Sequence, residues 1–168
     1  ERLESLKKRL EKYTEVHTLN FDVRNKTAVE KAIDSLPKAF QQIDLLINNA
    51  GNAHGLASFE NADMDDWDAM IDINVKGLLY VSQPIVKQMV TRKNGHIINI
   101  GSVAGKETYP NGNVYCASKH AVDAINSAMR LDLNKHNIKV SQVAPGMVET
   151  EFSLVRFKGN EAKSKSVY

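Results

Sequence analysis

The chain has 168 residues, of which 42% are apolar and 25% charged, and 22 Lys and Arg residues against 20 Asp and Glu residues give a formal net charge of +2. These ordinary values exclude a disordered or collagen-like chain, and without a basic stripe nothing points to nucleic acid or an anionic membrane. The single cysteine, Cys116, excludes an internal disulfide, and every apolar run is too short to span a bilayer. We therefore expect a protein of a reducing, aqueous compartment, the cytoplasm.

Helical and extended patterns alternate along the chain. An amphipathic helix over residues 3–13 comes first, and residues 16–19 are a strand candidate. Asn25 is placed to cap a helix that runs to residue 40, and residues 43–47 form the compact apolar run typical of a buried parallel strand.

The second half of the chain continues this alternation. Asp63 is placed to cap a long helix to about residue 89, which Gly77 and Pro84 should weaken or bend. A strand at residues 96–100, a helix at about residues 114–134 and a strand at residues 138–143 follow. Strands separated by helices predict an α/β fold with a parallel sheet and right-handed crossovers.

Small or polar residues follow each predicted strand. In open parallel sheets, ligands bind beyond the carboxyl ends of the strands, so these residues are the first site candidates. Taken singly, each is ordinary turn chemistry, but their recurrence at every strand end favours a binding site. The candidates are Asp22, Asn49 to Gly51, Ser102 and Pro145 to Thr150.

Tyr115 and Lys119 stand four residues apart at the start of the predicted helix 114–134, so they share one face. A surface tyrosine packed on a lysine stem is the ordinary interpretation. The functional one is that the ammonium group lowers the phenol pKa, which is about 10 without such a neighbour. Ser102 leaves the neighbouring strand and is placed to bind the same substrate oxygen. Asn74 interrupts an apolar stripe, which indicates either a structural clamp or a member of a polar network.

Together these residues form a series of motifs. Asn48-Asn49-Ala50-Gly51, Asn74, Ser102, the Tyr-x-x-x-Lys element from Tyr115 to Lys119, and Pro145-Gly146 resemble the short-chain dehydrogenase/reductase family from Asp22 to about Thr150. The resemblance implies a Rossmann-like, doubly wound parallel sheet and hydride transfer between a nicotinamide cofactor and a small-molecule alcohol or carbonyl. It also implies a homodimer or homotetramer.

The resemblance assigns a role to each matching residue. Tyr115 is then the acid–base residue, Lys119 lowers its pKa and binds the nicotinamide ribose, Ser102 orients the substrate oxygen, and Asn74 holds a water of the proton relay. The implied cofactor-binding residues are Asp22, Val23, Asn49, Ala50, Gly51, Tyr115, Lys119, Pro145, Gly146, Val148 and Thr150.

A narrower resemblance lies in the segment from Thr150 to Gly159, which is similar to NADP-dependent dehydrogenases of 3-hydroxy acids such as serine and allo-threonine. It implies NADP as cofactor, with NAD not excluded. Arg156 fits such a substrate because a guanidinium can hold a carboxylate bidentately, and the alternative is a surface arginine on a mobile lid. The histidines His54, His96 and His136 lack metal-ligand spacing, so we predict no metal.

The family's opening strand, glycine-rich turn and helix have no counterpart in this sequence, which contains no Gly-x-x-x-Gly-x-Gly element. We therefore expect residues 1–168 to be an incomplete single domain that lacks the first two strands, the glycine-rich loop and the last strand. Residues 16–19 would then have no sheet neighbour, and the chain by itself would bind dinucleotide weakly. Three possibilities remain open: a 3-hydroxy acid dehydrogenase, a catalytically inactive fragment or scaffold, and a family member that acts on another alcohol, such as a steroid or a sugar.

Overall fold

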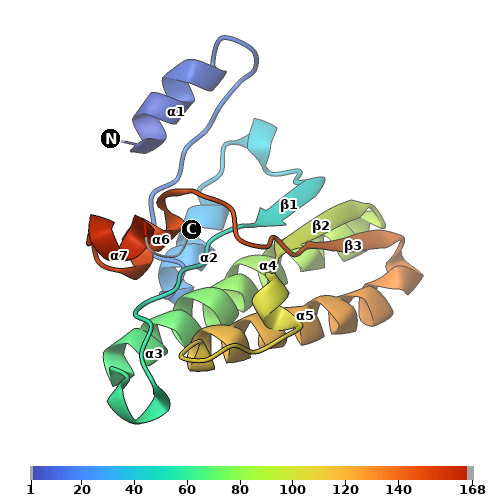
Figure 1. Ribbon diagram of the computed structural model, residues 1–168. Helices are drawn as coiled ribbons and strands as arrows, with labels where there is room; N and C mark the ends of the chain where they lie inside the picture. Colours follow the sequence, from blue (N-terminus) through green and yellow to red (C-terminus); the bar gives the residue numbers. More distant parts are fainter. Residues whose placement is uncertain (1, 166–168) are drawn as a thin grey trace.

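A computed structural model describes residues 2–165. Its centre is a sheet of three parallel strands, β1 (Leu45–Asn48), β2 (Gly95–Ile100) and β3 (Ile138–Val143), in that spatial order (Figure 1). Leu45 pairs with His96 and Gly95 pairs with Ile138, so the carboxyl ends of all three strands lie at the same edge. The predicted α/β class and the parallel sheet are confirmed.

Helices connect the strands and cover one face of the sheet, as Figure 1 shows for α4 and α5. The 3₁₀ turns are η1 (Lys38–Phe40), η2 (Phe59–Asn61), η4 (Val103–Gly105) and η5 (Asn134–His136). The helices are α1 (Arg2–Leu10), α2 (Lys26–Asp34), α3 (Met64–Ile71), the π-helical turn η3 (Asp72–Gly77), α4 (Leu78–Arg92), α5 (Asn113–Leu133), α6 (Glu151–Arg156) and α7 (Glu161–Lys165).

Both predicted helix caps are confirmed. The Asn25 side chain accepts a hydrogen bond from the Ala28 N–H at 3.0 Å, and the Asp63 side chain accepts one from the Asp65 N–H at 2.9 Å. The long helix predicted after Asp63 is divided, however, because the backbone widens into a π turn that ends at Gly77. Pro84 lies within α4 and does not end it.

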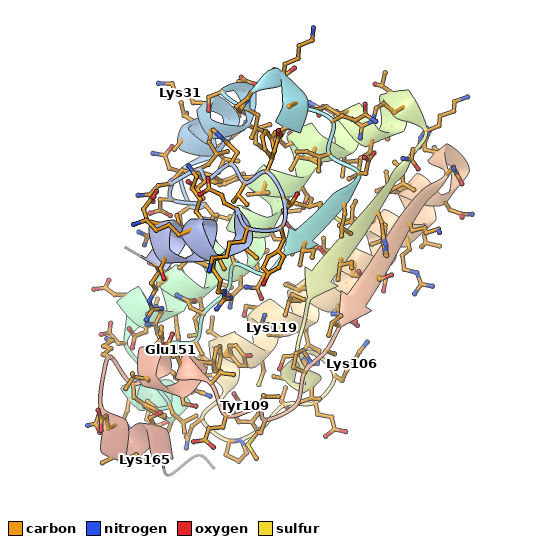
Figure 2. The ribbon with its side chains drawn as sticks, turned by 90° about the horizontal axis from the view of Figure 1, so that it is seen from above. Lys31, Lys106, Tyr109, Lys119, Glu151 and Lys165 are labelled. Atoms are coloured by element: carbon orange, nitrogen blue, oxygen red, sulfur yellow. The ribbon has the colours of Figure 1, made fainter. Side chains whose placement is uncertain are left out.

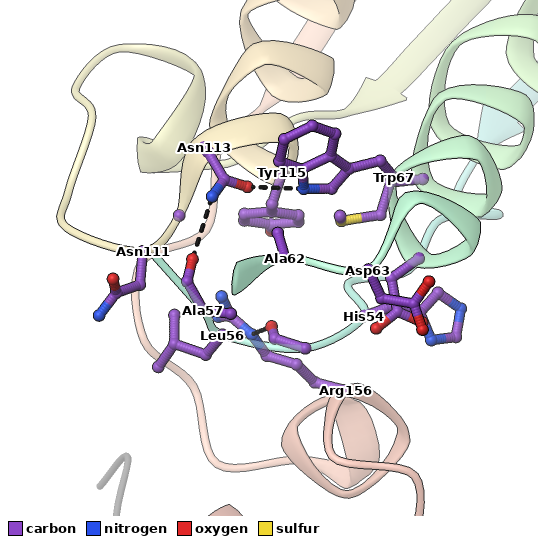
Figure 3. A pocket seen from close by; sticks show the side chains of 14 residues that line it. His54, Leu56, Ala57, Ala62, Asp63, Trp67, Asn111, Asn113, Tyr115 and Arg156 are labelled. Atoms are coloured by element: carbon purple, nitrogen blue, oxygen red, sulfur yellow. Dashed lines mark hydrogen bonds between the residues drawn. The ribbon is translucent and has the colours of Figure 1, made fainter. Parts of the chain in front are cut away.

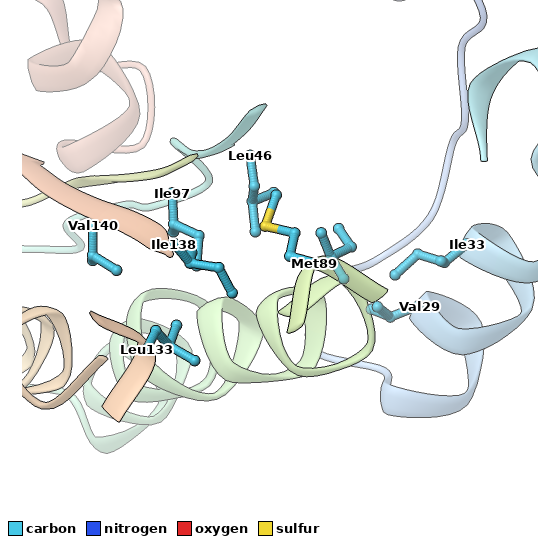
Figure 4. Close-up of a cluster of buried hydrophobic side chains, with 9 residues drawn as sticks. Val29, Ile33, Leu46, Met89, Ile97, Leu133, Ile138 and Val140 are labelled. Atoms are coloured by element: carbon cyan, nitrogen blue, oxygen red, sulfur yellow. The ribbon is translucent and has the colours of Figure 1, made fainter. Parts of the chain in front are cut away.

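The main hydrophobic core lies between the sheet and the helices that cover it (Figure 4). Met89 of α4 and Ile97 of β2 are fully buried at its centre. The core also contains Val29, Ile33, Leu46, Ile85, Leu133, Ile138 and Val140. Helix α2 packs against α4, and its Val29 and Ile33 side chains belong to the same core.

The opposite face of the sheet is exposed in the residues that the structure describes. Leu45 and Ile47 of β1 and Val143 of β3 expose about half of their surface, at 50%, 53% and 49%. The strand candidate at residues 16–19 forms no strand and belongs to no described sheet, in agreement with the expectation that this segment has no sheet neighbour. A strand needs a hydrogen-bonding neighbour, and no described strand lies beside this one. None of the described helices is long and apolar enough to cross a membrane.

Candidate active site

The loops that follow the three strands meet at the carboxyl edge of the sheet, and the amino-terminal end of α5 points into the same region (Figure 1). Figure 2 shows Lys119 near the ends of the strands and Tyr109 farther out in the loop that precedes α5. Loops from segments far apart in the chain therefore meet at this edge of the sheet.

Tyr115 lies in the first turn of α5 and is only 8% exposed. Its ring contacts the Phe152 ring of α6, with 5.8 Å between the centroids. Burial raises the pKa of the Tyr115 phenol, whereas hydrogen bonding to Ser102 and the charge of Arg156 act to lower it. Ser102 is itself buried and follows β2, as expected. Ser102 and Tyr115 are therefore in position to bind one substrate oxygen together.

Lys119 lies one turn further along α5 and is 7% exposed. Its Nζ donates a hydrogen bond to the Ile100 carbonyl oxygen at 3.1 Å, and burial lowers the pKa of the ammonium group. An ammonium group has three N–H donors, so Lys119 retains donors for a ligand.

Asn74 is 2% exposed and acts as a clamp. Its Oδ1 accepts from the Asn52 N–H at 2.8 Å, and its Nδ2 donates to the Asn52 carbonyl at 2.9 Å and to the Ser118 hydroxyl at 3.0 Å. It thereby ties the loop after β1 to α5. The π turn η3 carries Asn74 into this position within an otherwise helical stretch. These contacts fit both interpretations of Asn74, because they fix the Asn52 backbone and also join Asn74 to the Ser118 hydroxyl in a polar network.

Arg156, at the end of α6, is 7% exposed, which excludes the interpretation as a surface arginine. Its Nε donates to the Gly55 carbonyl at 2.9 Å, and the Gly55 N–H donates to the Arg156 carbonyl at 3.0 Å. Its Nη1 donates to the Tyr109 hydroxyl at 3.3 Å. These bonds use two of the five guanidinium N–H groups, so three remain for other partners.

A pocket lies between α3, α5 and α6 (Figure 3). Tyr115 and Arg156 both line it, together with His54 and Trp67. The Trp67 indole donates to Asn113 Oδ1 at 3.0 Å, and the Asn113 amide donates to the Ala57 carbonyl at 3.0 Å. The indole and the loop after β1 are therefore held in place by the first residue of α5.

Most of the loop residues expected to hold the cofactor are exposed. Asn49 to Gly51 follow β1, and Gly146 to Thr150 follow β3 with largely exposed side chains. The Arg24 guanidinium beside Asp22 lowers the pKa of that carboxyl group, and the shortest of their bonds is 2.6 Å. A Cβ atom on Gly51 would lie 3.2 Å from Asn74 Oδ1 and 3.5 Å from Lys119 Nζ, so the glycine leaves space beside the ammonium group.

Four residues of the site were not predicted from the sequence. Asn52 and Gly55 act through backbone groups, which a motif does not reveal, and Ser118 lies inside the Tyr-x-x-x-Lys element as an ordinary small residue. Tyr109 had no signal except its place six residues before Tyr115. Among the described residues, no group of three or more His, Cys, Asp or Glu side chains could hold a metal ion.

An α/β sheet with a buried Ser, Tyr and Lys at its carboxyl edge defines a class of nicotinamide-linked oxidoreductases. The family model described as short chain dehydrogenase matches residues 1–160, and this chain belongs to that family. It is 46% identical to the NADP-dependent 3-hydroxy acid dehydrogenase YdfG of Salmonella typhi over 169 aligned positions, which cover all of this chain and 67% of that protein.

Two further relatives agree with this assignment. The chain is 43% identical to sulfoacetaldehyde reductase 2 of Chromohalobacter salexigens, over all of this chain and 67% of that protein. The closed form of a serine dehydrogenase complexed with NADP⁺ superposes with a TM-score of 0.95 at 43% identity, over 99% of this chain and 67% of that one. The chain is thus a homologue of NADP-dependent dehydrogenases and spans about two thirds of their length.

Proposed function

We propose that the protein transfers a hydride between NADP(H) and the alcohol or carbonyl carbon of a small 3-hydroxy acid. The observation that carries this proposal is the buried guanidinium of Arg156 beside the Tyr115 phenol in one pocket. A carboxylate on Arg156 would place the hydroxyl-bearing carbon, two carbons further along the same small molecule, near the acid–base residue. Two Arg156 N–H groups at the outer end of the guanidinium suit a bidentate carboxylate.

In the proposed reaction, Tyr115 gives its proton to the alkoxide oxygen that forms on reduction and takes a proton from the alcohol on oxidation. Ser102 binds the same oxygen. Lys119 keeps its ammonium group near the ribose, and Asn74 fixes the loop after β1 relative to α5. The Tyr115 side chain is well suited to this work because Phe152 and Arg156 shield its ring from water.

The residues present fit the nicotinamide end of a dinucleotide. Space beside Gly51 adjoins the Lys119 ammonium group, whose free N–H donors match ribose hydroxyls. Asp22 and Val23 would bind near the adenine, Asn49 to Gly51 along the adenosine ribose, and Pro145, Gly146, Val148 and Thr150 over the nicotinamide. When bound, the cofactor supplies or accepts the hydride.

The names of the relatives support an acidic substrate. One is named for 3-hydroxy acids, and another is named for sulfoacetaldehyde, an aldehyde that carries a sulfonate. Both molecules combine an anionic group with a carbonyl or alcohol on a short carbon chain. A single buried guanidinium beside the acid–base tyrosine suits this combination better than a steroid or a sugar, which have no such charge.

The experiment that tests this proposal is a substrate panel with the full-length protein and NADP⁺. We expect oxidation of serine and 3-hydroxypropionate and at most weak oxidation of 1,3-propanediol, in which an alcohol replaces the carboxylate. Arg156→Gln should raise KM for the acids roughly 10- to 100-fold and leave that for the diol unchanged. Equal oxidation of the acids and the diol would indicate that the natural substrate is another alcohol. If no alcohol is oxidised, and Tyr115→Phe behaves like the unaltered protein, the chain belongs to a scaffold and not to an enzyme.

A further inference from the structure

Asn113, the first residue of α5, joins three parts of the pocket. Its Oδ1 accepts a hydrogen bond from the Trp67 indole at 3.0 Å and another from the Val114 N–H at 2.7 Å. Its Nδ2 donates to the Ala57 carbonyl oxygen at 3.0 Å. Figure 3 shows the bonds to Trp67 and Ala57. One amide group therefore connects α3, the start of α5 and the loop after β1.

These bonds exceed what the end of a helix requires. A capping side chain needs only to accept from an N–H group in the first turn, and the bond from Val114 meets that need. The bonds with Trp67 and Ala57 reach 46 and 56 positions back along the chain. Capping does not account for them, so the Asn113 side chain has a task outside α5.

The loop after β1 is attached to α5 at two points. At the first, Asn74 binds the Asn52 backbone and the Ser118 hydroxyl of α5. At the second, Asn113 binds the Ala57 carbonyl oxygen. A short segment that is held at both ends has lost most of its conformational freedom. The part of the loop between these two points therefore keeps a fixed position along the helix.

This part of the loop carries Arg156. The Gly55 carbonyl accepts from Arg156 Nε at 2.9 Å, and the Gly55 N–H donates to the Arg156 carbonyl at 3.0 Å. One residue separates Gly55 from Ala57. The bond from Arg156 to the Tyr109 hydroxyl is longer, at 3.3 Å. The position of the guanidinium relative to α5 therefore depends on the bond between Ala57 and Asn113.

The same asparagine also adjoins the acid–base residue of the proposed reaction. Tyr115 lies two residues after Asn113, within the first turn of α5. In the proposed function, the acid group of the substrate binds Arg156 and its hydroxyl-bearing carbon faces Tyr115. The separation of these two side chains then decides how many carbons fit between the acid group and the hydroxyl. Asn113 lies at the point from which both side chains are positioned.

We propose that Asn113 is a positioning residue that sets the spacing between Arg156 and Tyr115, and that it thereby selects hydroxy acids by length. This inference rests on the proposed function for the place of the acid group and of the hydroxyl. A reacting carbon displaced by about 1 Å can lose about 10²-fold in rate, so one hydrogen bond suffices to discriminate a methylene group. Length selection then comes from a residue that does not touch the reacting atoms.

The test compares glycolate, 3-hydroxypropionate and 4-hydroxybutyrate as substrates of the full-length protein with NADP⁺. All three are primary alcohols with one carboxylate, and they differ only in the number of methylene groups. Asn113→Asp keeps the acceptor oxygens for Trp67 and Val114 but has no N–H for Ala57. We expect the ratio of kcat/KM for 3-hydroxypropionate to that for 4-hydroxybutyrate to fall roughly 10-fold. The added charge weakens the three acids alike and leaves this ratio unchanged.

A second variant and a matched control accompany Asn113→Asp. Asn113→Ser retains a capping hydroxyl but is too short to reach Ala57, and it should lower the same ratio. Asn126→Ala removes another amide of α5, 11 positions after Tyr115, which is 4% exposed and accepts from Asn99 Nδ2 at 3.0 Å. This control should cost stability and leave the ratio unchanged. If the Asn113 variants change kcat/KM for all three acids by one common factor, Asn113 is merely structural and the proposal is overturned.

A measurement without NADP or turnover follows the link to Arg156 itself. In ¹⁵N-labelled full-length protein, Arg156→Lys identifies the Arg156 Nε–H resonance, and its exchange with water is compared between variants at one pH. We expect exchange to be roughly 10-fold faster in Asn113→Asp and unchanged in Asn126→Ala, because only the former releases the loop that holds Nε. Equal exchange in all three proteins would overturn the proposal.

The two measurements separate this inference from the proposed function. If the unaltered protein oxidises 3-hydroxypropionate no better than 1,3-propanediol, the proposed function and the length selection fail together. Faster Arg156 exchange in Asn113→Asp would then still show that Asn113 positions Arg156. If the acid is preferred but neither the exchange nor the ratio responds to Asn113, the proposed function stands and the inference fails.

Discussion

The substrate side and the cofactor side of this site are built differently. On the substrate side, Arg156, Tyr115 and Asn74 are all less than 9% exposed, and hydrogen bonds from the chain hold Arg156 and Asn74 in place. On the cofactor side, Asp22, Asn49 to Gly51 and Gly146 to Thr150 lie on exposed loops. The difference teaches that the residues of the substrate side are already held in place by contacts within this part of the chain, whereas the loops of the cofactor side make few such contacts within it.

The strongest test of this contrast is Tyr115→Phe. The ring contacts with Phe152 and Arg156 survive in this variant, so the fold should be retained. Only the proton donor is removed, and we expect kcat to fall by about 10²- to 10⁴-fold. Steady-state rates with NADP⁺ and serine measure the loss, and fluorescence titration with NADPH should give an unchanged Kd. A variant that keeps full activity would remove Tyr115 from the acid–base role.

Asn74→Ala should disturb the substrate side because it removes the hydrogen bonds that hold the backbone of Asn52. The substitution leaves the buried N–H and carbonyl groups of Asn52 without their partner, at a cost of about 1–3 kcal/mol for each group that finds no replacement. Urea unfolding measures this destabilisation. Ser82→Ala, at another buried polar position, provides a control, because Ser82 does not contact the loop after β1 at Asn52. If Asn74→Ala is no less stable than Ser82→Ala, the clamp has no energetic role.

Lys119 lies where the substrate side and the cofactor side meet, and its burial predicts how the stability of the protein depends on pH. Burial lowers its pKa in the folded state, so the unfolded chain binds a proton that the folded chain has lost in the window between the two pKa values. Stability should therefore rise with pH through that window, up to the ordinary lysine pKa of about 10.4. Urea unfolding from pH 7 to pH 10.5 should show this rise, and Lys119→Met should lack it. Identical slopes in the two proteins would mean that Lys119 is solvated.

The smallest effect is expected at Lys158. Its ion pair with Asp66 joins the end of α6 to α3, but the lysine side chain is 60% exposed, so water screens the pair. Lys158→Ala should lower the free energy of unfolding by less than about 1 kcal/mol and leave kcat unchanged. Thermal unfolding at low and high salt measures this loss of stability. A large, salt-independent loss would show that the substrate side depends on this pair.

Features of the fold that depend only on residues close by in the sequence were predictable. Asn25 and Asp63 cap their helices because a cap needs only the next three residues, and the strand at residues 138–143 has the bounds expected. The local pattern at residues 16–19 is that of a strand, but a strand exists only through a hydrogen-bonding partner, and the missing neighbour expected from the sequence explains why no strand forms there. The π turn was missed because it keeps nearly the helical periodicity.

The site follows the same division. The spacing of Tyr115 and Lys119 places both on one face of a helix whatever the rest of the chain does. The contact between Arg156 and the Tyr115 ring depends on how α6 docks, and because Arg156 lies 41 positions after Tyr115, no local spacing encodes this contact. The sequence predicted that Asn74 is a clamp or a member of a polar network, and only the structure identifies its partners as the Asn52 backbone and the Ser118 hydroxyl.

The π turn at Asp72–Gly77 has a consequence for how this protein can tolerate change in length. A π turn contains about one residue more than an α-helical turn over the same rise. Deletion of one residue from this turn would therefore leave an uninterrupted α-helix but rotate Asn74 or the following residues by about 100° around its axis. We therefore expect natural homologues to keep the length of this segment unchanged, although its sequence pattern is that of an ordinary helix.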